Sequence, residues 1–485
     1  MDLCTTWSKR SSNHGRTSCR RGDIQLMAAA LLAAGLCASA PADAQPAAPA
    51  EPAAPAEPAA PGPLPDQARG YDVPPGIEAE DVGLFVPRAV LFLPRMTLKA
   101  IFYPIAKTLA FLDRHAVIET IEDVLYNDER TAAIVPVLSV DTFFGPAIGV
   151  KAFHENLAGH GERGSIDARF GGQYEKAYQI AFRADFAGGS RVWVESIARF
   201  EIDPALLFQG IGDVDTGAGG SGLGPRDAAV ETRFRERRFL SLQRLGYTVG
   251  EGAALTKIGV TGTLNNRAFE PAHKATDPSI ETVYDTSRIV GFDRGVDIFE
   301  LTGNLVVDTR DVPGATSSGA YFEVFGGGAP ALGNYTYWHY GVEATGYFDL
   351  YKKTRVLVLR AALEATEGDS ADIPFSELPR LGGPYRLRGY PLDRFRDEKA
   401  AVGTIEYHYP IHQFLAGSLY ADVGHVAPGY KELFDNNWSV GVGGGFIVRS
   451  RDRVILTLDV AYGDGVHVYA TTDPLRAFSK RDTEL

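Results

Sequence analysis

The sequence predicts an all-β protein, a transmembrane antiparallel β-barrel of sixteen strands, on three observations. From about residue 131 to 478, successive segments alternate apolar and polar side chains and are separated by Gly, Pro, Asp or Asn. The chain begins with residues typical of an export signal, and aromatic residues such as Trp193 and Trp338 stand near the ends of these segments. A secreted sandwich or a propeller would also alternate, so the number of strands and this context favour the barrel.

The net charge and the cysteine content give further information about partners and redox chemistry. The 485 residues have a formal net charge of -13. Because a nucleic-acid binder needs a basic face to meet phosphates, no nucleic-acid partner is expected. The three cysteines, Cys4, Cys19 and Cys37, all lie within the first forty residues. The predicted barrel therefore contains no thiol that could be oxidised.

Residues 1–44 are predicted to be a signal peptide. Several arginines precede the apolar run Leu26–Ala40, and Ala42-Asp43-Ala44 offers the small-x-small pattern that a signal peptidase accepts. Lipid attachment at Cys37 is less favoured, because a leucine precedes it where lipoprotein signals have a small residue. The sequence therefore predicts cleavage near Ala44 and a location in the bacterial outer membrane.

Two further segments precede the predicted barrel. Residues 45–64 are almost entirely Ala, Pro and Glu and are expected to form an extended linker. Residues 65–130 show a helical pattern with apolar side chains on one side and basic ones on another, divided by Pro94 and Pro104. Two interpretations stay open for this segment. It is a basic amphipathic segment on a membrane surface or at the barrel mouth, or it is a small periplasmic helical unit.

The barrel is expected at residues 131–478, with a C-terminal tail at 479–485. Outer-membrane barrels commonly end on an aromatic residue, and here Phe478 is displaced from the end by that tail. An even number of strands leaves both ends of the barrel chain on one side of the membrane. The sixteen expected strands span residues 133–140, 146–155, 164–175, 177–187, 190–202, 231–248, 253–267, 296–309, 319–328, 336–350, 354–366, 402–410, 416–425, 438–449, 453–463 and 465–472.

One connection, before the twelfth strand, has an unusual composition. Residues 379–398, "PRLGGPYRLRGYPLDRFRDE", contain five arginines together with prolines and paired glycines. In the two strands that follow, the period-2 alternation places Glu406 and Asp422 on one wall, facing the lumen. An arginine on a loop folded into the barrel would bridge these carboxylates, since the planar guanidinium suits them better than an ammonium does.

Four stretches in this part of the chain resemble the BamA superfamily of outer-membrane barrels. Leu387-Arg388-Gly389-Tyr390 is similar to the V-R-G-[FY] motif of the family's sixth extracellular loop, and Asp308-Thr309-Arg310-Asp311 to its D-T-R-D strand and turn. Tyr420-Ala421-Asp422-Val423-Gly424 resembles its F-x-D-x-G strand, and Glu406 occupies the acidic position of the preceding strand. The resemblance covers roughly residues 130–478.

The family resemblance and the expected pairing of an arginine with the lumen carboxylates both predict that the 379–398 loop folds into the barrel. Arg388 is expected to bind Glu406 and Asp422, and to matter more than Arg386 or Arg396. Gly389 permits a close approach or a backbone conformation that a side chain forbids, and Gly382-Gly383-Pro384 would turn the loop inward. The alternative is a solvated extracellular loop with ordinary surface charges.

The chain also departs from the family pattern. Members that assemble barrels or secrete a partner usually carry periplasmic POTRA domains, and residues 65–130 are too short and too helical for one. The chain is therefore most similar to the POTRA-less branch of the superfamily. This departure puts capture of substrates by the usual periplasmic module in doubt.

No enzymatic site, cofactor or metal is expected. "GAGGSGLG" at residues 217–224 lacks the G-x-S-x-G spacing of a nucleophile elbow. His154-Glu155 and His160 miss the H-E-x-x-H spacing that places two metal ligands on one helix face.

Three functional hypotheses follow. In the first, the first and last strands pair poorly, and the barrel inserts or exports proteins by opening at this seam, where Pro136 removes a hydrogen-bond donor. Its partners would be outer-membrane lipid and nascent outer-membrane or exported proteins, with one chain forming the barrel. In the second, the protein is a passive or loop-gated outer-membrane channel, or a purely structural barrel without insertase activity. In the third, it is a secreted soluble β-protein that binds a partner.

Overall fold

The structure is a computed structural model. It describes residues 125–141, 144–185, 191–212, 231–250, 254–272, 277–312, 316–412, 415–435, 437–449 and 454–471. The predicted signal peptide, the linker, most of the 65–130 segment, Phe478 and the tail lie outside the described residues.

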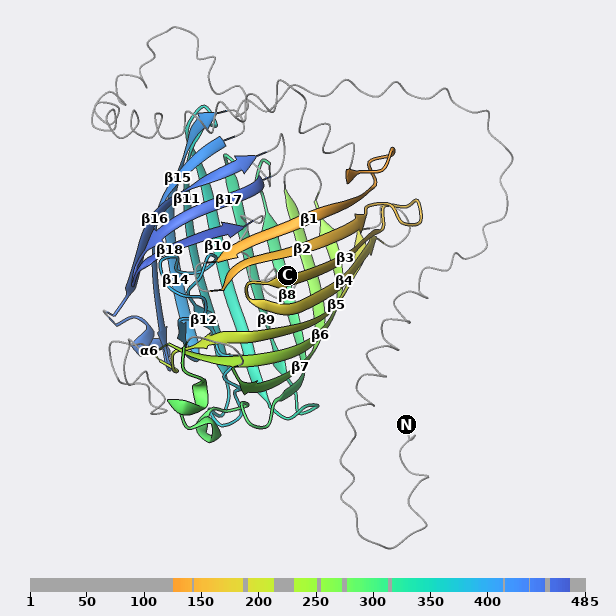
Figure 1. Cartoon of the computed structure of the whole chain (residues 1–485). Helices are drawn as coiled ribbons and strands as arrows, with labels where there is room; N and C mark the ends of the chain where they lie inside the picture. The colour runs from red at the N-terminus through yellow and green to blue at the C-terminus, as the bar shows by residue number, and fades with distance from the viewer. Residues whose placement is uncertain are drawn as a thin grey trace, which may run out of the picture. The chain divides into compact units, whose positions relative to one another are not determined.

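Sixteen strands form a closed antiparallel barrel (Figure 1), so the predicted fold class and strand number are confirmed. Strands β12 and β13 lie apart from the wall in the loop between β11 and β14, so β14 is the twelfth strand of the wall. The wall strands are Ala132–Asp141 (β1), Gly145–His154 (β2), Arg163–Gly171 (β3), Tyr174–Asp185 (β4), Val192–Phe208 (β5), Thr232–Val249 (β6), Leu255–Pro271 (β7), Val296–Asp308 (β8), Gly319–Ala329 (β9), Tyr337–Tyr351 (β10), Arg355–Glu367 (β11), Lys399–His412 (β14), Leu415–Ala427 (β15), Ser439–Arg449 (β16), Val454–Tyr462 (β17) and Val466–Thr471 (β18).

Several strand ends differ from the prediction by a few residues, and two of these differences have a local cause. β3 stops at Gly171 rather than at residue 175, because Gly171 and Gly172 both have positive φ and form the tight turn into β4. β5 continues beyond residue 202 to Phe208, although Pro204 lies within it. A register shift between Asp203 and Leu206 opposite β6 accommodates the proline, since an irregular pairing does not require its missing N–H.

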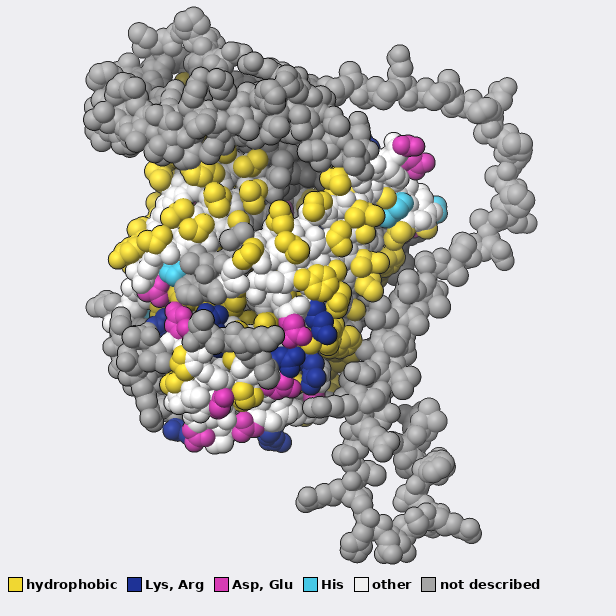
Figure 2. Space-filling model, viewed as in Figure 1, with side chains coloured by type: hydrophobic (Ala, Val, Ile, Leu, Met, Phe, Trp, Pro, Cys, Tyr) yellow, Lys and Arg dark blue, Asp and Glu magenta, His cyan; other side chains and the backbone are white. Residues whose placement is uncertain are grey.

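The two faces of the wall have opposite chemistry. On β14 the side chain of Ile405 is 51% exposed, whereas Thr404 and Glu406 on either side of it are buried. Apolar side chains cover much of the outside of the strands in view (Figure 2). Exposed apolar residues of this outer face include Ile134, Leu138, Ile148, Ile166, Ile180, Val260, Leu419, Val440 and Val442. This is the arrangement of a barrel that faces lipid outside and a polar lumen inside.

The connections at the two ends differ in length. One end carries the long connections 209–231, 272–295 and 368–398, and the other carries short turns such as 352–354 and 413–414. Short turns mark the periplasmic end of outer-membrane barrels and long loops mark the extracellular end. We orient the barrel accordingly, with the start of β1 and the end of β18 on the periplasmic side.

An aromatic core closes part of the extracellular end. Phe208 and Phe234 from strands β5 and β6 pack with Phe269, Phe292 and Phe375, the last two from the long extracellular loops. The 272–295 loop contributes two short 3-10 helices to this region, Ile280–Thr282 (η2) and Thr286–Arg288 (η3). This core holds the extracellular loops in place over the lumen.

The seam between the first and last strands is short. Among the described residues, β1 and β18 pair through two Cα positions, Val140 with Ala470 and Asp141 with Tyr469. On its other edge β1 pairs with β2 through ten positions. In the described part of the chain, no helix has both the length and the apolar character needed to cross a bilayer.

Candidate functional site

The candidate site is the loop of residues 368–398, which packs against the lumen side of the wall. Its base is a small hairpin in which Arg380–Leu381 (β12) pairs with Phe395–Arg396 (β13). At the glycine pair, Gly382 and Gly383 have φ values of 117° and 82°, conformations that side chains disfavour. Their N–H groups donate to the carbonyls of Arg386 and Tyr390, so the turn is fixed by the loop itself.

Arg388 lies at the tip of the loop and is fully buried. Its Nε and one Nη donate to the two carboxylate oxygens of Asp422 at 2.8 and 2.9 Å, and its backbone N–H donates to the same carboxylate at 3.0 Å. The same guanidinium contacts Glu406 at 3.0 Å. The two acidic residues named from alternation therefore meet this arginine, one from β14 and one from β15.

Further groups surround the guanidinium. Its central carbon lies 3.2 Å from the centre of the Tyr420 ring, which stacks against it from β15. A third carboxylate, Asp459 on β17, lies 4.0 Å away. His408 binds Glu406 at 2.7 Å. A buried charge is tolerated only when it is paired, so this cluster holds the loop tip to the wall by charge as well as by shape.

Glycines make the room that the tip occupies. A Cβ at Gly441 of β16 would lie 1.8 Å from the carbonyl oxygen of Arg388. Gly389 has a φ of 94°, and a Cβ there would lie 2.7 Å from the backbone of Tyr462 at the end of β17. At Gly424, a Cβ would lie about 3 Å from methyl groups of Leu381 and Leu387. At Gly463, a Cβ would lie 2.5 Å from the carbonyl oxygen of Gly389. We call Gly424, Gly441 and Gly463 the glycine seat.

The loop tip also contacts the last hairpin of the barrel. The hydroxyl of Tyr469 on β18 donates to the carbonyl of Tyr390 at 2.9 Å and accepts from the N–H of Gly389 at 3.4 Å. In the β17–β18 turn, the N–H of Asp464 donates to the carbonyl of Gly389 at 3.1 Å. Because Tyr469 is also one of the two seam positions of β18, the loop tip is held directly beside the seam.

The opposite side of the loop is fixed to β10 and β11. Arg360 of β11 binds both oxygens of Glu343 on β10 and donates to the carbonyl of Tyr385 at 2.9 Å. Arg386 pairs with Glu364 of β11. Leu387 has a φ of 66°, unusual for a leucine, and is buried among apolar side chains of the loop and of the adjacent wall strands. The loop therefore extends across the lumen side of the wall from β11 to β18.

Arg386 and Arg396 are more enclosed than expected from the sequence. Both are buried, and the guanidinium of Arg396 lies 5.1 Å from the ring of Phe208 and 5.5 Å from that of Phe375. The expectation that they matter less than Arg388 therefore finds no support in their burial. Arg396 connects the base of the loop to the aromatic core at the extracellular end.

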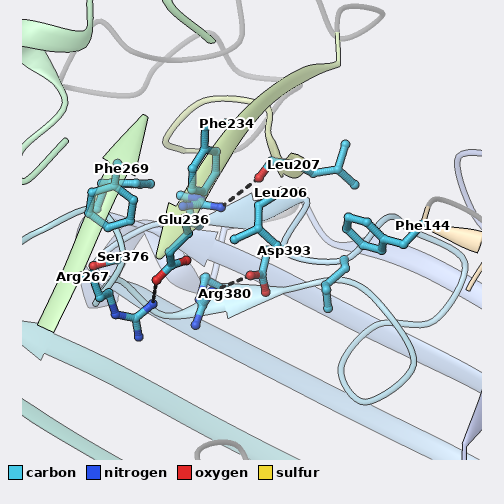
Figure 3. A pocket seen from close by; sticks show the side chains of 13 residues that line it. Phe144, Leu206, Leu207, Phe234, Glu236, Arg267, Phe269, Ser376, Arg380 and Asp393 are labelled. Carbon is cyan, nitrogen blue, oxygen red and sulfur yellow. Dashed lines mark hydrogen bonds and ion pairs between the residues drawn. The ribbon is translucent and has the colours of Figure 1, made fainter. Parts of the chain in front are cut away.

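The base of the loop leaves no room for a substrate. Arg380 points to Asp393 within the loop, and Arg267 points to Glu236 between neighbouring wall strands, beside Phe234 (Figure 3). The cavity here is about 10 Å³, which is about the room that one water molecule needs. A larger cavity of about 110 Å³, lined mostly by polar and charged residues, lies in the lumen between β6 to β11 and the loop.

The D-T-R-D residues lie elsewhere, at the periplasmic turn after β8. Arg310 binds both oxygens of Asp308 at 2.8 and 2.7 Å and stacks on Tyr321. The carboxylate of Asp311 accepts from the N–H groups of Val312 and Ser317, which shapes the turn. The structure does not bring these three residues to the loop, and their contacts are those of a strand end and its turn.

Two contributors to the site were missed from the sequence. Tyr420 lies within a stretch that was singled out, and alternation alone would have placed it on the wall with Asp422. Tyr469 gives no such signal, because it meets the loop only through the closure of the barrel. Among the described residues, no group of His, Cys, Asp and Glu side chains is placed to hold a metal ion.

A closed sixteen-stranded wall with an apolar outside and a docked internal loop defines a class, the outer-membrane β-barrels with a lumen loop. The model of the Omp85 superfamily domain matches residues 156–464. The chain belongs to the Omp85 superfamily, which confirms the resemblance to the BamA superfamily and indicates an outer-membrane location.

One solved structure agrees on the fold, and two more show a weaker similarity. BamA from Haemophilus ducreyi lacking POTRA domains 1–3 is similar with a TM-score of 0.51 and 13% identity, over 70% of each chain. CdiB from Acinetobacter baumannii has 12% identity and a TM-score of 0.42, over 70% of this chain and 58% of its own. CdiB from Escherichia coli has 10% identity and a TM-score of 0.43, over 70% and 60%. No curated protein matches the chain.

Proposed function

We propose that this barrel inserts polypeptide into the outer membrane, or moves it across, through the seam between β1 and β18. The observation that carries the proposal is the pairing at that seam. Between described residues, two Cα pairs join β1 to β18, against ten between β1 and β2 and six between β17 and β18. Over this part of the chain, opening the seam separates fewer paired residues than opening either neighbouring strand pair.

A short seam also leaves the edge of β1 before Val140 without a Cα pair to the described residues of β18. Such an edge is a template for an added strand, and a client segment would pair with it by β-augmentation. Pro136 lies within β1 and donates no hydrogen bond from its backbone. Nascent outer-membrane or exported proteins, which supply strands of this kind, are the clients that we infer.

The docked loop supports the same proposal. It fills the lumen beside the seam and contacts Tyr469 of β18, so it holds the closed form of the last hairpin. A polypeptide would enter the wall at the seam, since the loop occupies the path through the centre. One chain completes the wall, so we propose that a single barrel is active, surrounded by outer-membrane lipid.

The test is the folding rate of a simple reporter barrel in liposomes that contain this protein, compared with empty liposomes. We expect faster folding with the protein. The seam is tested by a disulfide between Val140→Cys and Ala470→Cys, in a chain whose three native cysteines are replaced by serine. The paired Cα atoms of these residues suit such a bond.

The matched control places the disulfide between Val460→Cys and Val468→Cys, a pair joining β17 to β18. We expect the seam disulfide to abolish the acceleration and reduction to restore it, whereas the control disulfide leaves it unchanged. Equal folding rates with and without the parent protein, in samples shown to be folded, would rule out insertase activity.

A channel is the second candidate function, favoured by the polar lumen cavity of about 110 Å³. Its walls include Arg238, Arg244 and His339 together with Glu300 and Glu323. Planar-bilayer conductance of the parent and of Arg388→Ala distinguishes this function. A steady conductance in the parent, without faster reporter folding, would favour the channel.

A further inference from the structure

The connection between β15 and β16 lies outside the wall, unlike the 368–398 loop. We call its described residues, 428–435 and 437–438, the outer strap. It contains one helical turn, Tyr430–Leu433 (α6), seen beside the wall in Figure 1. Leu433 is fully buried and packs on Ala401 of β14 and Ala427 of β15.

The alternation of the wall strands shows which face the strap covers. Ala401 shares its face of β14 with Ile405, which is 51% exposed. Ala427 shares its face of β15 with Leu419 and Val423, which are 50% and 38% exposed. Leu433 therefore packs on the outer, lipid-facing side of the wall.

Polar contacts hold the strap on that side. The ring of His425 on β15 is hydrogen-bonded to the carbonyl of Leu433 at 2.9 Å. The hydroxyl of Tyr430 is hydrogen-bonded at 2.6 Å to that of Tyr340 on β10. Lys399 of β14 lies 5.8 Å from the centre of the Tyr430 ring. The strap thus crosses the outer face of strands β10 to β15 and is anchored at both ends of its helical turn.

The position of the strap along the wall places it near the lipid. Ala401 pairs with His425, and Gly403 pairs with Val423. Two residues of a strand rise about 7 Å, so the strap lies only about that far above the lipid-facing Val423. This is the region in which barrels carry their aromatic girdle.

The strap carries three aromatic side chains, of which Phe434 is the most exposed. Phe434 is 64% exposed and Tyr430 is 39% exposed, whereas Leu433 between them in the chain is fully buried. Trp438 lies against His425 at the end of the strap. The exposed charged residues of the strap are Lys431, Glu432 and Asp435, so it carries no cluster of positive charge.

We propose that the outer strap is a membrane anchor whose occupant is the outer leaflet, with the ring of Phe434 inserted at the boundary between headgroups and acyl chains. Amphipathic segments bind at this boundary with the apolar face buried about 5–10 Å. Tyr430 and Trp438 stand at the headgroup level, where tyrosine and tryptophan are favoured. The anchor fixes β15 and β16 against the bilayer on the side of the barrel that holds the Arg388 loop.

The test labels position 434 with an environment-sensitive fluorophore. The full chain, with Cys4, Cys19 and Cys37 replaced by serine, carries Phe434→Cys and is folded into phosphatidylcholine vesicles. Some of the lipids bear a nitroxide at the upper or at the lower acyl chain. We expect blue-shifted emission and a loss of fluorescence that is larger with the upper nitroxide, together with weak quenching by aqueous iodide.

Two labelled controls calibrate the result. Ile405→Cys reports the lipid-facing wall, and Leu332→Cys reports a side chain that is 75% exposed in the β9–β10 extracellular turn. Adding Leu433→Ala to the Phe434→Cys chain removes the buried contact of the strap, and we expect the nitroxide quenching at position 434 to fall.

Three results would overturn the proposal. Emission and iodide quenching at 434 equal to those at 332 would show that the strap is in water. Protection from both iodide and nitroxide would show that protein, such as a second copy of the chain, covers Phe434. Nitroxide quenching that Leu433→Ala leaves unchanged would show that the packing on the wall does not place Phe434 in the lipid.

Discussion

Replacing Arg388 by alanine tests whether the loop is held by charge. In the parent, the guanidinium makes two hydrogen bonds to Asp422 and one contact to Glu406, all at 3.0 Å or less. The variant leaves two buried carboxylates without their cation, and loss of one partner of a buried pair costs about 3–5 kcal/mol. The backbone N–H at position 388 still donates to Asp422, so we expect the lower part of this range.

This loss of docking free energy raises the fraction of molecules in which the loop is undocked and exposed. Since every 1.4 kcal/mol is a factor of ten in an equilibrium, a loss of about 3 kcal/mol raises the undocked population about a hundredfold. Cleavage of a transiently opened segment follows that population when opening is fast. We therefore expect the loop to be cut about a hundredfold faster in Arg388→Ala.

The assay is limited proteolysis of folded protein in micelles with a protease of broad specificity, because trypsin would lose a site in the variant. Arg388→Lys keeps the charge but loses the planar fork, so an intermediate rate is expected. Arg244→Ala is the matched control. Arg244 is a lumen arginine on β6 that binds Glu195 and Thr261. Equal protection of the loop in Arg388→Ala and in the parent would refute the reasoning.

Three other predictions concern the same loop. Gly441→Ala places a methyl group against the carbonyl of Arg388 and should destabilise the docked loop by about 1–3 kcal/mol, seen as faster proteolysis; parent-like protection would contradict the glycine seat. Tyr469→Phe removes the donor to Tyr390 and should lower the free energy of unfolding in urea by about 1 kcal/mol, whereas an unchanged midpoint would show that water replaces the hydroxyl. Burial raises the pKa of Asp397 to about 6. The folded state therefore binds the proton more tightly than the unfolded state does. The free energy of unfolding should fall as pH rises from about 4 through about 6. Asp397→Asn should flatten that slope, and an unchanged slope would assign it to other groups.

The wall was predictable because the alternation of apolar and polar residues within each strand shows which side chains lie on which face. Ile405 and Glu406 are adjacent, yet one is exposed to lipid and the other is buried, and the period of two says so without any tertiary information. The same period assigns Asp422. Boundaries were harder where local rules conflict, as at Pro204, where a register shift lets β5 continue through a residue that usually ends strands.

Contacts that depend on barrel closure were not predictable. Tyr469 reaches the loop because β18 meets β1 at a particular offset, and nothing within residues 466–471 encodes that offset. The outer strap was missed for a similar reason. Its sequence is too short to show a periodicity. Leu433 packs on two small residues, Ala401 and Ala427, and these belong to two different strands.

The glycine seat has a consequence for motion. At Gly441 and Gly389 the backbone of the loop packs directly against the backbone of the wall. The buried charges around Arg388 are stable only while they are paired. A small displacement of the loop would therefore break both the close backbone contact and the ion pairs. Closely packed elements of this kind switch between discrete arrangements rather than deform continuously. The lumen of this barrel should accordingly behave as a two-position device, blocked or cleared, with no graded opening between.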